Sequence, residues 1–181
     1  AGQYIKSDGS KNLAFATLPT AGFTLGTPVA STSGTSIDFT GIPSGTKQII
    51  FSWVGVSTNG TSHPIWQLGD SGGVETSGYL GSGLVHNTGT GVDNNTDGLG
   101  MVGSGGGWTA GTVIHGNATF TLVDASTFTW AMHFVGGGSN SASMNYGGAS
   151  KSLSAELTQI RCTTEGGSNT FDAGKMNIAY I

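Results

Sequence analysis

The feature that most limits the fold of this chain is a two-residue alternation of apolar side chains. The segment "STFTWAMHFV" places Phe128, Trp130, Met132 and Phe134 on one face and mostly polar side chains on the other. Successive side chains of a β-strand point to opposite faces, so this pattern predicts a strand with one buried face. A short turn-forming segment separates it from "NATFTLVD", and residues 117–135 are therefore predicted to form a β-hairpin.

Three further segments have the composition of strands. Residues 47–57 are apolar on both faces, which predicts a central strand covered on both sides. Residues 151–164 change the phase of their alternation, which predicts a β-bulge, and residues 174–181 alternate to the end of the sequence. Because no segment has the 3.6-residue period of a helix, the expected fold class is all-β. An antiparallel, jelly-roll-like β-sandwich is the expected architecture.

The charge content of the chain excludes several classes of partner. Only 9% of the 181 residues are charged, the net charge is −4, and Lys and Arg together number six. A nucleic-acid-binding face needs many basic groups to displace counterions, and an anionic membrane surface attracts the same groups. No apolar run approaches the roughly 20 residues that span a bilayer. We therefore expect no nucleic-acid partner and no membrane insertion.

The single cysteine excludes an intrachain disulfide. Cys162 lies in the strand-like segment "LTQIRCTT", where a buried thiol is the expected role. Stability must then come from a large core or from oligomerisation.

The chain divides into two regions by sequence pattern. Residues 1–30 contain two of the four prolines and lack regular alternation, so they are predicted to be an N-terminal connector that packs against the domain or leads from a preceding stalk. Residues 31–181 are predicted to be the β-sandwich module. Within it, the glycine-rich residues 81–111 are predicted to form a long loop without secondary structure, and such loops usually have a function.

The segment "GDSGG" at 69–73 matches the nucleophile loop of chymotrypsin-like proteases in its letters. A serine nucleophile needs a base within hydrogen-bond distance. His63 is the only histidine upstream of Ser71 and is eight residues away, whereas the proteases place theirs far upstream. The segment is therefore interpreted as a turn in which Asp70 and Ser71 cap backbone amides. The ten acidic residues show no spacing diagnostic of a glycosidase, so we expect no enzymatic activity and no catalytic residues.

The sequence favours neither a metal nor a cofactor. "DNNTDG" at 93–98 begins like a calcium loop, but Ser104 stands at the twelfth position, where such a loop needs Glu. A polar surface loop is the preferred interpretation, and cation binding by this loop stays open. The four histidines are scattered and show no HxH or HxxxH spacing.

The aromatic residues are predicted to have different roles. Trp53, Trp66 and Trp130 lie on apolar strand faces and are expected in the core. Trp108 is surrounded by glycine, so its ring either stacks on a sugar or a partner, or anchors the loop to the sandwich. The candidate ligand-binding residues, all in the segment 81–111, are Trp108, His86, Asp93, Asn94, Asn95 and Asp97.

Residues 30–181 resemble a module found near the C-termini of bacteriophage tail-fibre and related virion proteins. The matching pieces are "IDFTGIP" (37–43), "GTS" (60–62), "QLGDSGGVETSGY" (67–79), "LSAELTQIRCTT" (153–164) and "TFDAGKMNIAYI" (170–181). The resemblance implies that GDSGG is a structural signature, that the protein belongs to the virion, and that it forms a homotrimer. It also implies that an exposed tip contacts bacterial surface glycans, and it carries over no catalytic residue.

Two functions are therefore expected as alternatives. The first is a non-enzymatic, C-terminal receptor-binding domain of a phage tail fibre that recognises capsular polysaccharide or lipopolysaccharide. The second is a structural module that trimerises or caps the fibre without contacting the receptor.

Overall fold

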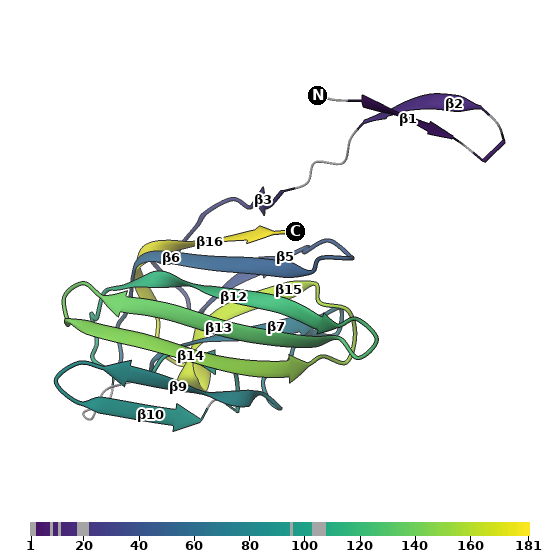
Figure 1. Ribbon diagram of the computed structural model, residues 1–181. Coiled ribbons are helices and arrows are strands. Elements are labelled where there is room, and N and C mark those ends of the chain that lie inside the picture. Colours follow the sequence, from purple (N-terminus) through teal and green to yellow (C-terminus); the bar gives the residue numbers. More distant parts are fainter. Residues whose placement is uncertain (1–2, 8, 11, 18–21, 95, 103–107) are drawn as a thin grey trace.

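The computed structural model describes residues 3–7, 9–10, 12–17, 22–94, 96–102 and 108–181. Over these residues the chain is an antiparallel β-sandwich, which confirms the predicted all-β fold class (Figure 1). Among the described residues, no helix is long and apolar enough to cross a membrane.

The sandwich consists of a larger and a smaller sheet. The larger sheet has nine strands, in the order β10 (Thr90–Asn94), β9 (Leu80–His86), β14 (Ser143–Ser152), β13 (Thr129–Gly138), β12 (Ile114–Asp124), β6 (Gln48–Thr58), β16 (Phe171–Tyr180) and β3 (Thr24–Leu25), with β4 (Val29–Ala30) also on β16. The smaller sheet has five strands, β11 (Leu99–Gly100), β7 (Pro64–Asp70), β15 (Gln159–Thr164), β5 (Ser36–Thr40) and β8 (Gly73–Val74), the last paired with β7. A single 3₁₀ turn, η1 (Glu165–Gly167), follows β15.

The core lies between the two sheets and is built around aromatic rings. Trp53 of the larger sheet stacks at 4.5 Å, centroid to centroid, on Trp66 of the smaller sheet, which also contacts Phe134 at 5.7 Å. Cys162 and Trp130 are buried in the same cluster, as the sequence predicted. Buried aromatic rings contribute much of the apolar area that stabilises a domain of this size.

The predicted hairpin at 117–135 is confirmed as the pair β12 and β13, with Phe120 opposite Met132. The segment predicted to be a central strand is β6, which lies between β12 and β16. The prediction that both of its faces are covered is wrong, because Val54 on the outward face is exposed. The outer face of the larger sheet carries no second layer over this residue.

The change of phase within 151–164 does not come from a bulge. β14 ends at Ser152 in the larger sheet and β15 begins at Gln159 in the smaller one. Leu153 and Leu157, in the connection, are buried in the core. The alternation restarts because the chain leaves one sheet and enters the other.

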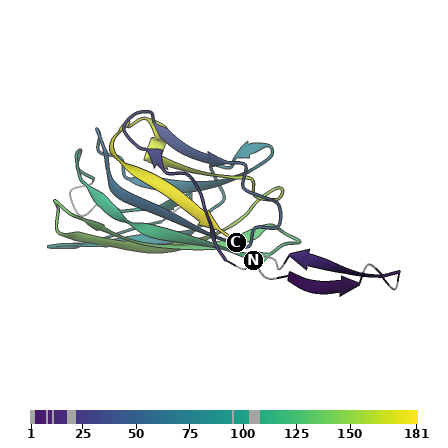
Figure 2. The ribbon, with the colours of Figure 1, turned by 90° about the horizontal axis from the view of Figure 1, so that it is seen from above.

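The N-terminal residues form strands of their own. β1 (Gln3–Ser7) and β2 (Leu13–Thr17) make a separate two-stranded sheet that lies beyond the sandwich, near the end at which β16 finishes (Figures 1 and 2). The short strands β3 and β4 instead pair with β16. Part of the segment predicted as a connector therefore extends the larger sheet.

The prediction that residues 81–111 lack secondary structure is wrong, because they contain most of β9 together with β10 and β11. Glycine concealed these strands, since it interrupts the apolar alternation that a strand normally shows. Close packing explains two of the glycines. A Cβ on Gly81 would lie 2.2 Å from the carbonyl oxygen of Gly148, and one on Gly147 would lie 2.6 Å from the ring of Phe134.

Candidate functional site

The GDSGG segment is a turn at the end of β7. The Gly72 amide donates to Asp70 Oδ1 at 2.7 Å, which confirms the predicted capping role of Asp70. Ser71 is exposed on this turn, whereas His63 precedes the opposite end of β7. A seven-residue strand is roughly 23 Å long at about 3.3 Å per residue. The fold therefore holds Ser71 far from the only upstream base.

A polar cluster beneath this turn accounts for its sequence. Ser154 donates its hydroxyl to Asp70 Oδ2 at 2.6 Å and its amide to Glu75 Oε1 at 2.7 Å. The buried Lys151 pairs with Glu75 at 2.5 Å and lies over the Tyr79 ring, 5.7 Å from its centroid. These bonds tie the turn to the crossover that follows β14.

The cluster stabilises both carboxylates in their charged forms. Hydrogen bonds from Ser154 and then from the Gly72 amide hold the pKa of Asp70 below its usual value. Burial raises the pKa of Glu75, but the bonds from Lys151 and Ser154 outweigh it, so the net direction is downward. A fully bonded, ionised cluster of this kind is structural, in agreement with the interpretation of GDSGG as a turn.

The structure does not gather the predicted ligand-binding residues into one site. His86 lies on the outer face of the larger sheet, where its Nδ1 is 3.4 Å from Thr90 Oγ1. Asp93 pairs with Gly83, so it points to the opposite face of the same hairpin. Asn94 is exposed at the end of β10, and Asn95 lies outside the described residues.

Trp108 is only 6% exposed and belongs to the core cluster. This burial contradicts the alternative in which its ring is free to stack on a sugar, and it agrees with the alternative of an anchor. The neighbouring glycines indicated an exposed ring because they offer it no side-chain contacts. Its burial comes instead from the core cluster, most of whose members lie far from it in the sequence.

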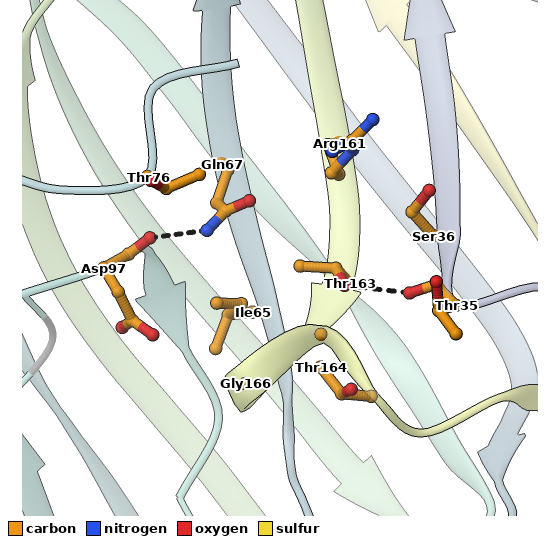
Figure 3. Close-up of a pocket in the computed structure, with 11 residues that line it drawn as sticks. Thr35, Ser36, Ile65, Gln67, Thr76, Asp97, Arg161, Thr163, Thr164 and Gly166 are labelled. Atoms are coloured by element: carbon orange, nitrogen blue, oxygen red, sulfur yellow. Dashed lines mark hydrogen bonds between the residues drawn. The ribbon is translucent and has the colours of Figure 1, made fainter.

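A polar groove runs over the outer face of the smaller sheet (Figure 3). Its volume is about 330 Å³, close to the lower limit of about 300–1,000 Å³ for small-molecule sites. The lining residues are Thr35, Ser36, Ile65, Gln67, Thr76, Asp97, Arg161, Thr163, Thr164, Gly166 and Gly167. Most of the side chains therefore offer hydroxyl, amide or charged groups.

Strand alternation places these side chains together. In β7, Trp66 points to the core, so its neighbours Ile65 and Gln67 point outward. Antiparallel pairing then puts Gln67 beside Arg161, and Thr163 beside both Ile65 and Ser36. Three neighbouring strands thus supply the floor of the groove.

Hydrogen bonds fix the shape of the groove. Thr163 donates to the carbonyl of Thr35 at 2.8 Å, and Gln67 donates to the carbonyl of Asp97 at 2.8 Å (Figure 3). Arg161 binds Asp38 through Nε at 2.6 Å and Nη2 at 3.0 Å, a bidentate pair that neutralises its charge. The Asp97 carboxylate has no hydrogen-bond partner among the described residues, so it can accept a bond from a ligand.

Asp97 is the one predicted ligand-binding residue that lines the groove. Sequence reasoning missed Gln67, Arg161 and Thr163, which occupy the polar positions of "PIWQLGD" and "QIRCTT". The signal is present but unspecific, because every half-buried strand has a polar face.

No family model, curated protein or solved structure matches this chain. The resemblance to tail-fibre modules therefore rests on the motifs quoted above.

Proposed function

We propose that this chain is a non-enzymatic recognition module that binds a bacterial surface glycan in the groove over β7, β15 and β5. The observation that carries the proposal is a preformed groove of about 330 Å³ that is lined by several hydroxyl and amide side chains and by the Asp97 carboxylate. Sugar hydroxyls need such donors and acceptors at fixed positions, and a groove held by backbone pairing provides them with little ordering cost. The resemblance to tail-fibre modules supports a capsule or lipopolysaccharide as the source of the glycan and the virion as the location of the protein.

The charges of the groove favour a neutral sugar or an amino sugar over an acidic one. Arg161 is already paired with Asp38, whereas Asp97 leaves a carboxylate available. A polyanionic glycan would meet this carboxylate without a free basic group nearby to offset the repulsion. The lining also contains no aromatic ring among its described residues, so a single site should be weak. Several copies on one particle would raise the effective affinity.

An array of bacterial capsular and lipopolysaccharide glycans tests this proposal. We expect the wild-type chain to bind a subset of neutral or amino-sugar glycans. Asp97→Asn should weaken that binding by about 1.5–3 kcal/mol, the range for a hydrogen bond to a charged group. Asp124→Asn, which changes an exposed carboxylate at the end of β12, is the matched control. No binding by the wild-type chain, or equal loss in both variants, would contradict the proposal.

A second function, assembly of a fibre, is favoured by the N-terminal hairpin. Ile5 and Phe15 are directly opposite each other in the β1–β2 pair and are 60% and 74% exposed. An isolated two-stranded hairpin is at best marginally stable in water, so this apolar face needs a partner. The homotrimer expected from the resemblance would bury it.

Sedimentation equilibrium of the wild-type chain and of an Ile5→Ser/Phe15→Ser variant tests the assembly function. We expect a wild-type trimer that dissociates in the variant. A wild-type monomer at micromolar concentration would contradict it and would leave the glycan proposal unaffected.

A further inference from the structure

Three potential metal ligands from distant parts of the chain meet beside the groove. His63 immediately precedes β7, Glu165 immediately follows β15, and Asp93 lies in β10, the edge strand of the larger sheet. One nitrogen or oxygen atom of each lies within 4.8 Å of the other two. We infer that His63, Asp93 and Glu165 form a binding site for a divalent transition-metal ion such as Zn²⁺.

The backbone holds two of these ligands in place. The Glu165 amide donates to the His63 carbonyl at 2.9 Å, which continues the pairing of Thr164 with Pro64. As a result, His63 Nδ1 lies 3.6 Å from Glu165 Oε2. Ligand atoms about 2.1 Å from a tetrahedral zinc ion lie about 3.4 Å apart. The observed separation of these two atoms is close to that spacing without any movement of the chain.

His63 points independently to a ligand. His63 is only 9% exposed, and its ring makes no hydrogen bond with the described residues. The 3.6 Å separation from Glu165 exceeds the hydrogen-bond range. A buried imidazole normally has a partner, and a metal ion bound to Nδ1 would supply it.

A bound cation would offset the charges of the two carboxylates. Asp93 and Glu165 carry like charges in the same cluster, and no ion pair among the described residues brings Lys or Arg to either. A divalent ion would balance both charges. One imidazole nitrogen with two carboxylate oxygens suits Zn²⁺ and neighbouring transition metals, whereas Ca²⁺ and Mg²⁺ prefer oxygen alone.

Such an ion would connect the two sheets. Asp93 belongs to the larger sheet, while His63 and Glu165 flank strands of the smaller one. Glu165 is followed directly by Gly166 and Gly167, which line the end of the groove. The ion would therefore fix one end of the groove, and this inference does not depend on what the groove binds.

Zn²⁺ titration of the untagged, chelator-treated chain, followed by calorimetry, tests the site without any glycan. We expect one Zn²⁺ per chain and a higher melting temperature when zinc is present. Asp93→Asn and Glu165→Gln change exposed residues. Each should weaken zinc binding by at least roughly 10–100-fold, which is the cost of losing a group that only supports a ligand. His63→Asn should weaken it further, and Co²⁺ should give visible absorption that this variant loses.

His86→Asn is the matched control, because His86 is exposed on the outer face of the larger sheet. It should leave the zinc stoichiometry and affinity unchanged. The site is refuted if the wild-type chain takes up no zinc at millimolar concentration, if the carboxylate variants bind as well as the wild type, or if Ca²⁺ binds and Zn²⁺ does not.

Discussion

Replacement of Trp108 by Ala should destabilise the protein strongly. The Trp108 side chain is 6% exposed and packs in the core between the sheets, although the residues before it in the sequence are glycines. If the ring is an anchor, its removal leaves a cavity that the rigid sheets cannot fill by relaxing. If it were a ligand-stacking ring, its removal would leave stability unchanged.

The expected loss follows from the buried area. A buried Trp removes up to about 250 Å² from water, worth roughly 5–6 kcal/mol at about 25 cal/mol per Å². The indole Nε1 has no hydrogen-bond partner among the described residues, so deleting it returns about 1–3 kcal/mol of desolvation cost. The net loss in unfolding free energy is about 2–5 kcal/mol, which overlaps the range of about 3–5 for aromatic-to-Ala changes in cores. In a chain of this length that corresponds to a fall in melting temperature of about 10 °C.

Thermal unfolding followed by circular dichroism measures this effect. Trp108→Phe should lose much less stability than Trp108→Ala, because it keeps most of the apolar volume and removes the unpaired N–H. Tyr146→Ala, which removes a ring that is 51% exposed on the larger sheet, should cost clearly less stability than Trp108→Ala. A Trp108→Ala variant that melts at the wild-type temperature would refute the assignment of this ring to the core.

Three further predictions concern the buried polar and thiol groups. Glu75→Gln should lower the unfolding free energy, measured by chemical denaturation, by about 2 kcal/mol, because Lys151 loses its partner. The loss is smaller than the roughly 3–5 kcal/mol of a fully buried pair because Glu75 is partly exposed. A change no larger than that of the exposed Glu156→Gln variant would contradict this prediction. Since the folded-state pKa values of Asp70 and Glu75 are lowered, their contribution to stability is complete above the ordinary values of 3.8 and 4.5 and is lost as the pH falls through the folded-state values. A melting temperature that stays constant as the pH is lowered below 4 would exclude this linkage. Burial raises the pKa of the Cys162 thiol, so this thiol should react with a thiol reagent only after unfolding. Rapid labelling of the native chain would show that the smaller sheet is misplaced.

The sequence predicted the strands whose apolar residues alternate without interruption. Residues 117–135 formed the expected hairpin because Phe120, Met132 and their neighbours can be buried only on one face. Prediction failed where side chains gave no pattern. Strands β9 and β10 contain several glycines, and their pairing depends on backbone hydrogen bonds and close approach to β14.

The candidate sites were harder to predict because they depend on contacts between distant strands. Gln67 and Arg161 are 94 positions apart in the numbering and become neighbours only when β7 pairs with β15. Likewise, His63 and Glu165 show no metal-binding spacing in the sequence, and the same strand pair brings them together. Local motifs cannot reveal sites of this type.

If the groove binds the glycan as proposed, a side chain that fills the groove should abolish binding. Thr76 is exposed on the rim, so Thr76→Trp should fill the groove without disturbing the fold. Thr88→Trp adds the same ring at an exposed position between β9 and β10, away from the groove. The measurement is the dissociation constant of each variant for a glycan that the wild-type chain binds. We expect binding to be lost in Thr76→Trp and kept in Thr88→Trp. Unchanged binding by a folded Thr76→Trp variant would contradict the assignment of the glycan to this groove.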